Sequence, residues 1–216
     1  MTVIVAVAAA LALLVGGIGV LARRFKWEAE AARKASHVAI GLVALALPWL
    51  FAQDAPVVGL ALAAGAGLLA LRTVPALRTR FGCAIHGVAR PSYGEFAFVG
   101  GVGLAFVLAH DHLGAYVAAI LTLTFGDTAA ALVGRRFGRH RYAVGHAGKS
   151  LEGSCAFFAV AATVCAVVPG GGSVVAVAAF ALATTLAEAL AGDGLDNAAI
   201  PVAGLVALRL FAGVTP

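Results

Sequence analysis

The sequence contains few charged residues. Only 12% of its 216 residues are Asp, Glu, Lys or Arg, whereas 62% are hydrophobic and the mean hydropathy is +1.01. Soluble domains carry about 25% charged residues. The composition therefore excludes a soluble domain and indicates an integral membrane protein.

Known soluble nucleotide-binding signatures are also absent from the sequence. It has neither a Gly-x-x-x-x-Gly-Lys-Ser/Thr phosphate loop nor the protein-kinase motif set, which excludes the soluble folds that carry them. Its three cysteines, Cys83, Cys155 and Cys165, lack the spacing of metal ligands. We expect them to be buried, inert thiols, with no disulfide and no zinc site.

Apolar runs recur along the whole chain. A membrane-spanning helix needs about 20 apolar residues, and eight runs approach that length: residues 3–22, 37–52, 56–71, 93–109, 114–134, 153–168, 173–191 and 198–214. The first run has no basic segment before it, so we expect a retained helix and not a signal peptide. The pattern predicts one all-α domain over residues 1–216, a polytopic membrane protein with seven to eight transmembrane helices.

The basic residues predict how this domain lies in the membrane. Fourteen of the fifteen Lys and Arg residues fall in the first, third and fifth connections between the runs. The positive-inside rule places those connections in the cytoplasm and the N-terminus outside. We expect a prokaryotic cytoplasmic membrane with the active site facing the cytoplasm. The net charge of +5 then favours anionic lipid headgroups and phosphates as partners over nucleic acid.

Asp127 is a lone carboxylate inside the fifth apolar run. A charge at membrane depth costs roughly 2.5–3.5 kcal/mol on insertion scales, so such a residue usually marks a functional site. On a regular helix Thr124, Asp127, Ala131 and Gly134 would share one small or polar face. The alternative is a carboxylate that only pairs with an arginine of a neighbouring helix.

A glycine- and arginine-rich loop follows Asp127. Arginine forks match phosphate oxygens, glycine permits close approach of the main chain, and a helix N-terminus attracts anions. The candidate phosphate-binding residues are Gly126, Gly134, Arg135, Arg136, Gly138, Lys149, Ser150, Glu152 and Gly153. The alternatives are that the arginines serve topology only, that Ser150 is a helix N-cap, and that Glu152 pairs with the helix dipole.

Two further clusters stand near the predicted cytoplasmic surface. Arg33, Lys34 and His37 stand at the entry to the second run and approach one another on a helix, as a functional group or as an interfacial anchor. Glu188 and the acidic turn at 192–197 could supply metal ligands or orient a hydroxyl. Capping of the last helix by Asp196 or Asn197 is the alternative.

Together these segments resemble one family. The pieces are Arg33-Lys-Ala-Ser-His37, Gly126-Asp-Thr-Ala-Ala130, Gly134-Arg-Arg-Phe-Gly138, Lys149-Ser-Leu-Glu-Gly-Ser154 and Asp196-Asn-Ala-Ala-Ile-Pro201. They are similar to the phytol kinase, farnesol kinase and dolichol kinase family of CTP-dependent lipid kinases, which is distantly similar to phosphatidate cytidylyltransferases. The resemblance covers about residues 33–201, and a looser similarity includes Glu95.

The resemblance implies transfer of the terminal phosphate of a nucleoside triphosphate, typically CTP, to a lipid hydroxyl. The acceptor would be an isoprenoid alcohol such as phytol, farnesol or a polyprenol, or diacylglycerol, and Mg²⁺ or another divalent cation would be the cofactor. The implied metal ligands are Asp127, Glu188 and Asp196. The implied catalytic residues are Asp127, Lys149, Glu188 and His37, with the general base open among Asp127, His37 and Glu188.

The remaining implied roles concern substrate binding. Lys149, Arg135 and Arg136 would hold triphosphate oxygens, and Arg33 and Lys34 would meet the nucleotide or a lipid headgroup. Glu95, Asp196 and Asn197 would contact the lipid hydroxyl or be structural.

The sequence is also compatible with two other functions. A cytidylyltransferase would use the same phosphate cradle, although its C-terminal signature is missing and Asp196-Asn197 stands in that place. A small ion-coupled transporter would use Asp127 and Glu188 as coupling carboxylates, but the polar residues crowd one side. Small-residue helix faces would also allow a homodimer.

Overall fold

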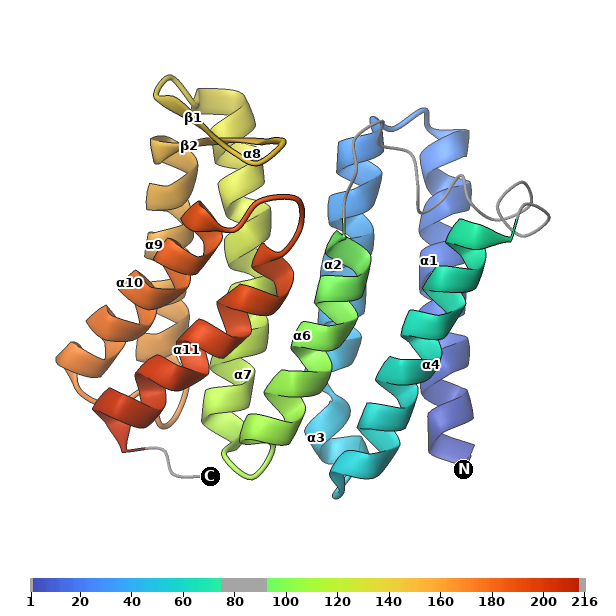
Figure 1. Cartoon of the computed structure of the whole chain (residues 1–216), viewed down its shortest axis with the longest axis horizontal. Coiled ribbons are helices and arrows are strands. Elements are labelled where there is room, and N and C mark those ends of the chain that lie inside the picture. The colour runs from blue at the N-terminus through green and yellow to red at the C-terminus, as the bar shows by residue number, and fades with distance from the viewer. Residues whose placement is uncertain (1, 75–92, 214–216) are drawn as a thin grey trace. The chain divides into compact units, whose positions relative to one another are not determined.

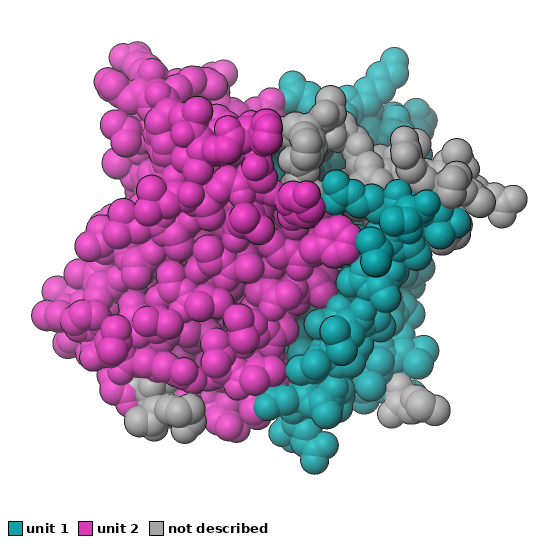
Figure 2. Space-filling model, in the orientation of Figure 1, with its two compact units in different colours: residues 1–91 teal, residues 92–216 magenta. Residues whose placement is uncertain are grey.

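The computed structural model describes residues 2–74 and 93–213, which divide into two compact units. Residues 1–91 belong to unit 1 and residues 92–216 to unit 2 (Figure 2). The Arg33–His37 motif therefore lies in unit 1, whereas the other motifs lie in unit 2. Cys83, Arg78, Arg80 and Arg90 fall outside the described residues.

Unit 1 is helical throughout its described part. It contains α1 (Thr2–Arg24), α2 (Ala29–Leu45), the short α3 (Leu47–Leu50) and α4 (Asp54–Thr73). The break between α2 and α3 lies just before Pro48, which lacks an N–H and is tolerated in the first turn of a helix but not in its interior. Helix α1 packs against α2 and α4.

Unit 2 contains the remaining described elements (Figure 1). Its long helical segment begins as α7 (Leu113–Leu121), passes through the π-helical turn η2 (Thr122–Gly126) and continues as α8 (Asp127–Phe137). The other helices are α6 (Gly94–Ala109), α9 (Leu151–Val167), α10 (Val174–Leu190) and α11 (Asp196–Ala212). Helix α11 packs against α6, α7 and α10, and α9 packs against α8 and α10.

Fully buried aromatic and aliphatic side chains fill the core of unit 2, among them Phe106, Tyr116, Ile120, Phe157 and Phe180. Arg209 lies in the last turn of α11, whereas the other described Lys and Arg residues of unit 2 lie in or next to the hairpin and the end of α8. Its guanidinium donates to the carbonyl of Leu108, 3.0 Å away, in the last turn of α6, where helix carbonyls lack a helical donor. The one basic residue outside the three basic connections thus has a structural role.

Seven of the eight predicted apolar runs each coincide with one helical segment in the described chain, and the second run, 37–52, is divided between α2 and α3. Within residues 2–74 and 93–213, three helical segments are long and apolar enough to cross a membrane: α1, α4 and the continuous segment Leu113–Phe137. Helices α6, α9 and α10 are apolar but shorter. The all-α prediction is confirmed in outline, and the count of seven to eight membrane spans stays a prediction.

The structure differs from the sequence analysis at several places. Helix α2 begins at Ala29, so Arg33 and Lys34 lie inside it and not ahead of it. The loop after α8 contains a hairpin of β1 (Arg141–Val144) and β2 (Ala147–Ser150), which pair antiparallel. Gly145, at φ +58°, supplies the left-handed conformation that its tight turn requires.

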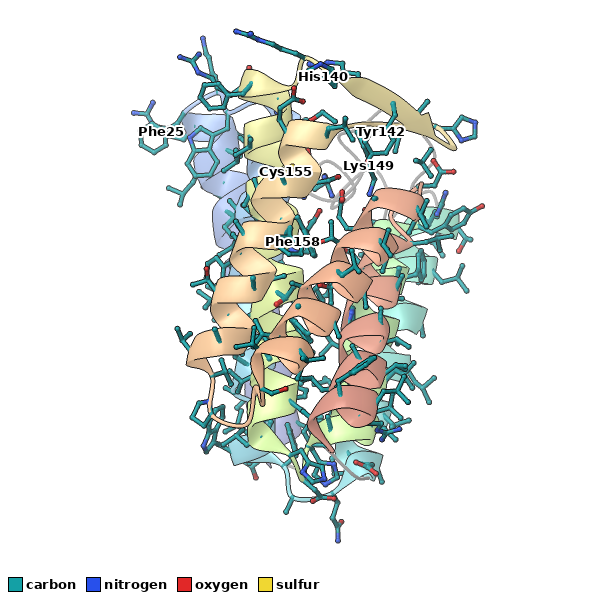
Figure 3. The ribbon with its side chains drawn as sticks, turned by 90° about the vertical axis from the view of Figure 1, so that its left-hand side faces the viewer. Phe25, His140, Tyr142, Lys149, Cys155 and Phe158 are labelled. Atoms are coloured by element: carbon teal, nitrogen blue, oxygen red, sulfur yellow. The ribbon has the colours of Figure 1, made fainter. Side chains whose placement is uncertain are left out.

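The prediction for the cysteines is correct for one residue and wrong for another. Cys165 is fully buried, and its thiol lies 3.7 Å from the carbonyl oxygen of Gly171. Cys155 is exposed on α9 (Figure 3), because the face of this helix that packs inward carries its neighbours Ser154 and Phe157.

Close approach of α6 and α11 requires a glycine at position 101. A Cβ added to Gly101 would lie 2.9 Å from the Cα of Ala198 and closer still to the carbonyl oxygen of Asn197. We expect Gly101→Ala to reduce the free energy of unfolding by about 1–3 kcal/mol, as overpacking does. Thermal unfolding of the detergent-solubilised protein measures this.

Gly100→Ala is the matched control, because a Cβ at Gly100 would meet no atom within 4 Å. Alanine is the better helix former, so this control should unfold at the same temperature or slightly higher. Equal unfolding temperatures for the two variants would contradict the assigned contact between α6 and α11.

Candidate active site

Lys149 lies at the centre of a buried ionic cluster. Its ammonium Nζ is 2.9 Å from Glu188 Oε1 and 3.1 Å from Asp196 Oδ2, and it also donates to the main-chain carbonyl of Glu188. The exposed fractions of the three side chains are 9%, 7% and 16%. All three ammonium donors are thus directed at oxygens from α10 and α11.

The cluster keeps Lys149 charged. Burial alone would lower the pKa of Lys149, but the adjacent carboxylates of Asp196 and Glu188 outweigh it and raise that pKa above its ordinary value. A buried charge of this kind requires such partners, because an unpaired one loses its hydration without compensation.

A second set of contacts holds the other oxygen of Glu188. The Ser154 hydroxyl donates to Glu188 Oε2 over 3.2 Å, and the Tyr142 hydroxyl lies 2.8 Å from Ser154 Oγ. Tyr142 pairs with Lys149 across the β1–β2 hairpin, so both side chains point to one face of it (Figure 3).

Tyr142 and Ser154 were not predicted as site residues from the sequence. Ser154 follows Ser150 by four residues, and this spacing only weakly indicated that the two serines lie on the same face of a helix. The partnership of Tyr142 with Lys149 depends on hairpin register, for which the sequence carries no signal.

Ser150 is the N-cap of α9. Its hydroxyl oxygen accepts a hydrogen bond from the Gly153 N–H at 3.1 Å, as in the alternative considered above. Glu152 in the same turn accepts from the main-chain N–H of His140 at 3.2 Å and lies 2.8 Å from its ring nitrogen Nδ1. These two residues fix the start of α9 next to the hairpin.

The glycines of this region permit close packing of α8 on α9. A Cβ added at Gly134 would lie 2.9 Å from Ser150 Oγ, and one at Gly153 would lie 2.7 Å from the carbonyl oxygen of Ala130. One at Gly138 would collide with Ser150 and the Gly134 carbonyl. These contacts give the glycines a structural role, and phosphate binding by them stays a prediction.

Arg135 and Arg136 are exposed in the last turn of α8. At the other end of that helix, Asp127 is its first residue and is only 8% exposed. The preceding Gly126 faces α9, because a Cβ there would lie 3.0 Å from the Phe157 ring. Asp127 therefore lies where the π-helical turn gives way to a regular α-helix.

The predicted metal ligands are only partly brought together. Glu188 and Asp196 meet around Lys149. Across residues 2–74 and 93–213, no three His, Cys, Asp or Glu side chains lie close enough to hold one metal ion. Asp127 therefore does not form a three-carboxylate metal site with Glu188 and Asp196 in this structure.

The turn between α10 and α11 ties the hairpin to α6. Asp193, at φ +55°, accepts a hydrogen bond from the His146 N–H through Oδ1 at 3.1 Å, and its carbonyl accepts one from the Tyr93 N–H at 2.9 Å. Asn197 donates from Nδ2 to the carbonyl of Gly94 at 2.9 Å, which gives it a structural role. Glu95 follows in the same turn of α6 and is half-buried.

The remaining predicted residues lie in unit 1. Lys34 and His37 are buried on α2 in a stripe with Gly41 and Ala44. Arg33 forms an ion pair with Glu30, one turn earlier on the same helix, at 2.6 Å.

The sequence is similar over most of its length to that of a known protein. The chain is 34% identical over 196 residues to the phytol kinase of Synechocystis sp., in an alignment that covers 86% of the chain and 80% of that kinase. The chain belongs to the phytol kinase family. No protein-family model matches the sequence, and no solved structure matches it. The family assignment made from the motifs is thus confirmed.

A substitution of Lys149 tests whether its ion pairs stabilise the fold of this member of the phytol kinase family. Lys149→Met leaves the buried carboxylate of Glu188 and the half-buried carboxylate of Asp196 without their cation. We expect the free energy of unfolding to fall by about 3–5 kcal/mol, as when one partner of a buried pair is removed. Thermal unfolding in detergent measures this loss.

Arg141→Met is the control, because Arg141 lies in the same hairpin but is exposed and donates only to the carbonyl of Gly138 in the described contacts. It should change stability by less than about 0.5 kcal/mol. A Lys149→Met protein that unfolds like the wild type would show that the cluster does not stabilise the fold.

Proposed function

We propose that this protein is a membrane-embedded lipid kinase that transfers the terminal phosphate of CTP to the hydroxyl of an isoprenoid alcohol, with phytol as the first candidate. The observation that carries the proposal is the relationship to a phytol kinase over most of both chains. The cluster of Lys149, Glu188 and Asp196 at one end of unit 2 supports it, because phosphoryl transfer requires charged groups that position the phosphates.

The donor set of this cluster suits a hard divalent cation. Glu188 and Asp196 already direct carboxylate oxygens at one cationic centre, the ammonium of Lys149, and Mg²⁺ prefers oxygen ligands of this kind together with substrate phosphates. We propose that Asp127, with Glu188 or Asp196, holds Mg²⁺. The ion would neutralise charge on the nucleotide phosphates.

The protein's own cations complete the proposed phosphate site. The exposed Arg135 and Arg136 would bind triphosphate oxygens with their guanidinium groups as bidentate partners. Lys149 would bind a phosphate oxygen in exchange for one of its three present acceptors. In unit 1, contact of Arg33 and Lys34 with the nucleotide or an anionic headgroup stays a prediction. Both oxygens of Glu188 already accept hydrogen bonds, one of them from Lys149, so a bound Mg²⁺ would take the place of that ammonium, and we do not choose Glu188 as the general base. Asp127 is then our first choice for the general base, ahead of His37.

The apolar helices support a location within the membrane. The hairpin and the starts of α6, α9 and α11 lie at one end of unit 2 (Figure 1). We propose that this end faces the cytoplasm, which supplies the nucleotide. The alcohol would enter sideways from the lipid and bring its hydroxyl to the polar end.

Phosphate-labelled CTP distinguishes the kinase from a cytidylyltransferase. Purified protein with Mg²⁺ and phytol or farnesol should transfer label from the γ-phosphate of CTP to the lipid and none from the α-phosphate. Parallel reactions with ATP, GTP and UTP test the choice of donor. Label that reaches a lipid only from the α-position would contradict phosphate transfer and favour nucleotidyl transfer.

Asp127→Asn tests the proposed metal ligand. The amide keeps the shape of the side chain but removes its charge, so we expect turnover to fall by about 10²–10³-fold, the usual loss for a key electrostatic group. The folded protein should elute and unfold as the wild type does. Asp111→Asn is the control, because Asp111 is 78% exposed in the turn between α6 and α7, the other end of the unit. Near-normal turnover by Asp127→Asn would remove Asp127 from the mechanism.

A further inference from the structure

Two buried hydroxyls in unit 2 lack the partner that buried threonines normally have. Thr122 and Thr124 are both fully buried, and within the described part of the chain neither Oγ1 has a hydrogen-bond partner. Both belong to η2, the π-helical turn that ends directly before Asp127.

Other helical threonines of the same protein show what is missing. Thr128 donates to the carbonyl of Thr124 at 2.7 Å, and the buried Thr184 donates to that of Phe180 at 2.8 Å. This bond to the residue four positions earlier is the usual way in which a helical threonine satisfies its hydroxyl. Thr122 and Thr124 do not make it.

Burying a hydroxyl without a partner costs about 1–3 kcal/mol, a cost that valine at the same position would avoid. The π-helical turn is itself uncommon, and such turns occur often at functional sites. An unpaired, fully buried hydroxyl in such a turn therefore indicates a group that is kept for a ligand. Of the two, Thr124 is the one that shares a helix face with Asp127, three residues later.

The chemistry of the turn selects an uncharged ligand with a hydroxyl group. Each threonine hydroxyl offers one donor and two acceptor positions but no charge, which suits another hydroxyl better than a phosphate or an ion. Phe125, on the same turn, is 39% exposed, so the turn reaches from the apolar surface of the molecule to the buried hydroxyls. A lipid chain on that surface would bring its alcohol head next to Thr124, and because Thr124 is fully buried, binding would require the side chains that cover it to move.

We propose that η2 binds the hydroxyl of the acceptor alcohol through the side chain of Thr124. Asp127 follows Thr124 by three residues, about 4 Å of helix rise, so the bound oxygen would lie within one turn of the proposed metal ligand. This assignment rests on the proposed function for the identity of the alcohol.

The test compares Thr124→Val and the double variant Thr122→Val/Thr124→Val with Thr184→Val in the full-length protein. We expect the KM for phytol or farnesol to rise about 10-fold in Thr124→Val, the loss of one hydrogen bond. The KM for CTP should stay the same. The unfolding temperature should be unchanged or higher, because the substitution removes an unpaired buried hydroxyl. Thr124→Ser should restore the alcohol KM.

Thr184→Val is the matched control, because its hydroxyl is buried but already bonded within α10. It should lower the unfolding temperature and leave the alcohol KM unchanged. A double variant with alcohol KM and kcat within twofold of the wild type would overturn the proposal and leave the two hydroxyls to packing or a buried water. If the valine variants do not fold, Thr124→Ala is measured in the same way.

Alcohol binding without nucleotide separates this inference from the proposed function. Phytol should raise the unfolding temperature of the wild type more than the matching hydrocarbon phytane does. Thr124→Val should lose that difference and Thr184→Val should keep it. If the difference is present but no nucleotide supports phosphate transfer, the proposed function fails and the hydroxyl site stands. No difference in a protein that does phosphorylate phytol would overturn the hydroxyl site alone.

Discussion

The arrangement of the polar end of unit 2 depends on the burial of one ammonium group. Lys149 cannot lie at 9% exposure without compensating charge, and the two carboxylates that supply it come from α10 and α11. The ion pairs therefore hold β2 against both helices. Because Ser154 of α9 donates to the same Glu188, this electrostatic requirement joins four elements at one place.

Steric constraints then fix where the hairpin begins and ends. Gly134 and Gly138 allow α8 to lie against the Ser150 cap of α9, which directs the hairpin out of the helix pair. Asp193 holds the far end through His146. The packing at Gly134 and Gly138 and the hydrogen bond between Asp193 and His146 thus hold the hairpin in place independently of the charge of Lys149.

The sequence predicted most of the helices but little of the side-chain arrangement. Runs of apolar residues are local, so the eight segments and the candidate role of Asp127 could be read from composition and position. The π-helical turn could not, because a regular helix period was assumed through Thr124. Tyr142 and Ser154 were missed because their roles depend on hairpin register and on contact with Glu188, 34 residues after Ser154 in the chain.

The continuous segment from α7 to α8 orders its polar groups along one direction. Uncharged, buried threonines come first, the carboxylate of Asp127 follows, and exposed Arg135 and Arg136 end the segment. A reaction between a lipid alcohol and a water-soluble anion needs that order, because the alcohol oxygen comes from an apolar phase and the phosphates from water. A regular helix would satisfy the threonines internally. The π-helical turn leaves these hydroxyls unpaired at the point where the lipid alcohol and the water-soluble phosphates would meet. We therefore connect this irregular turn with the proposed reaction.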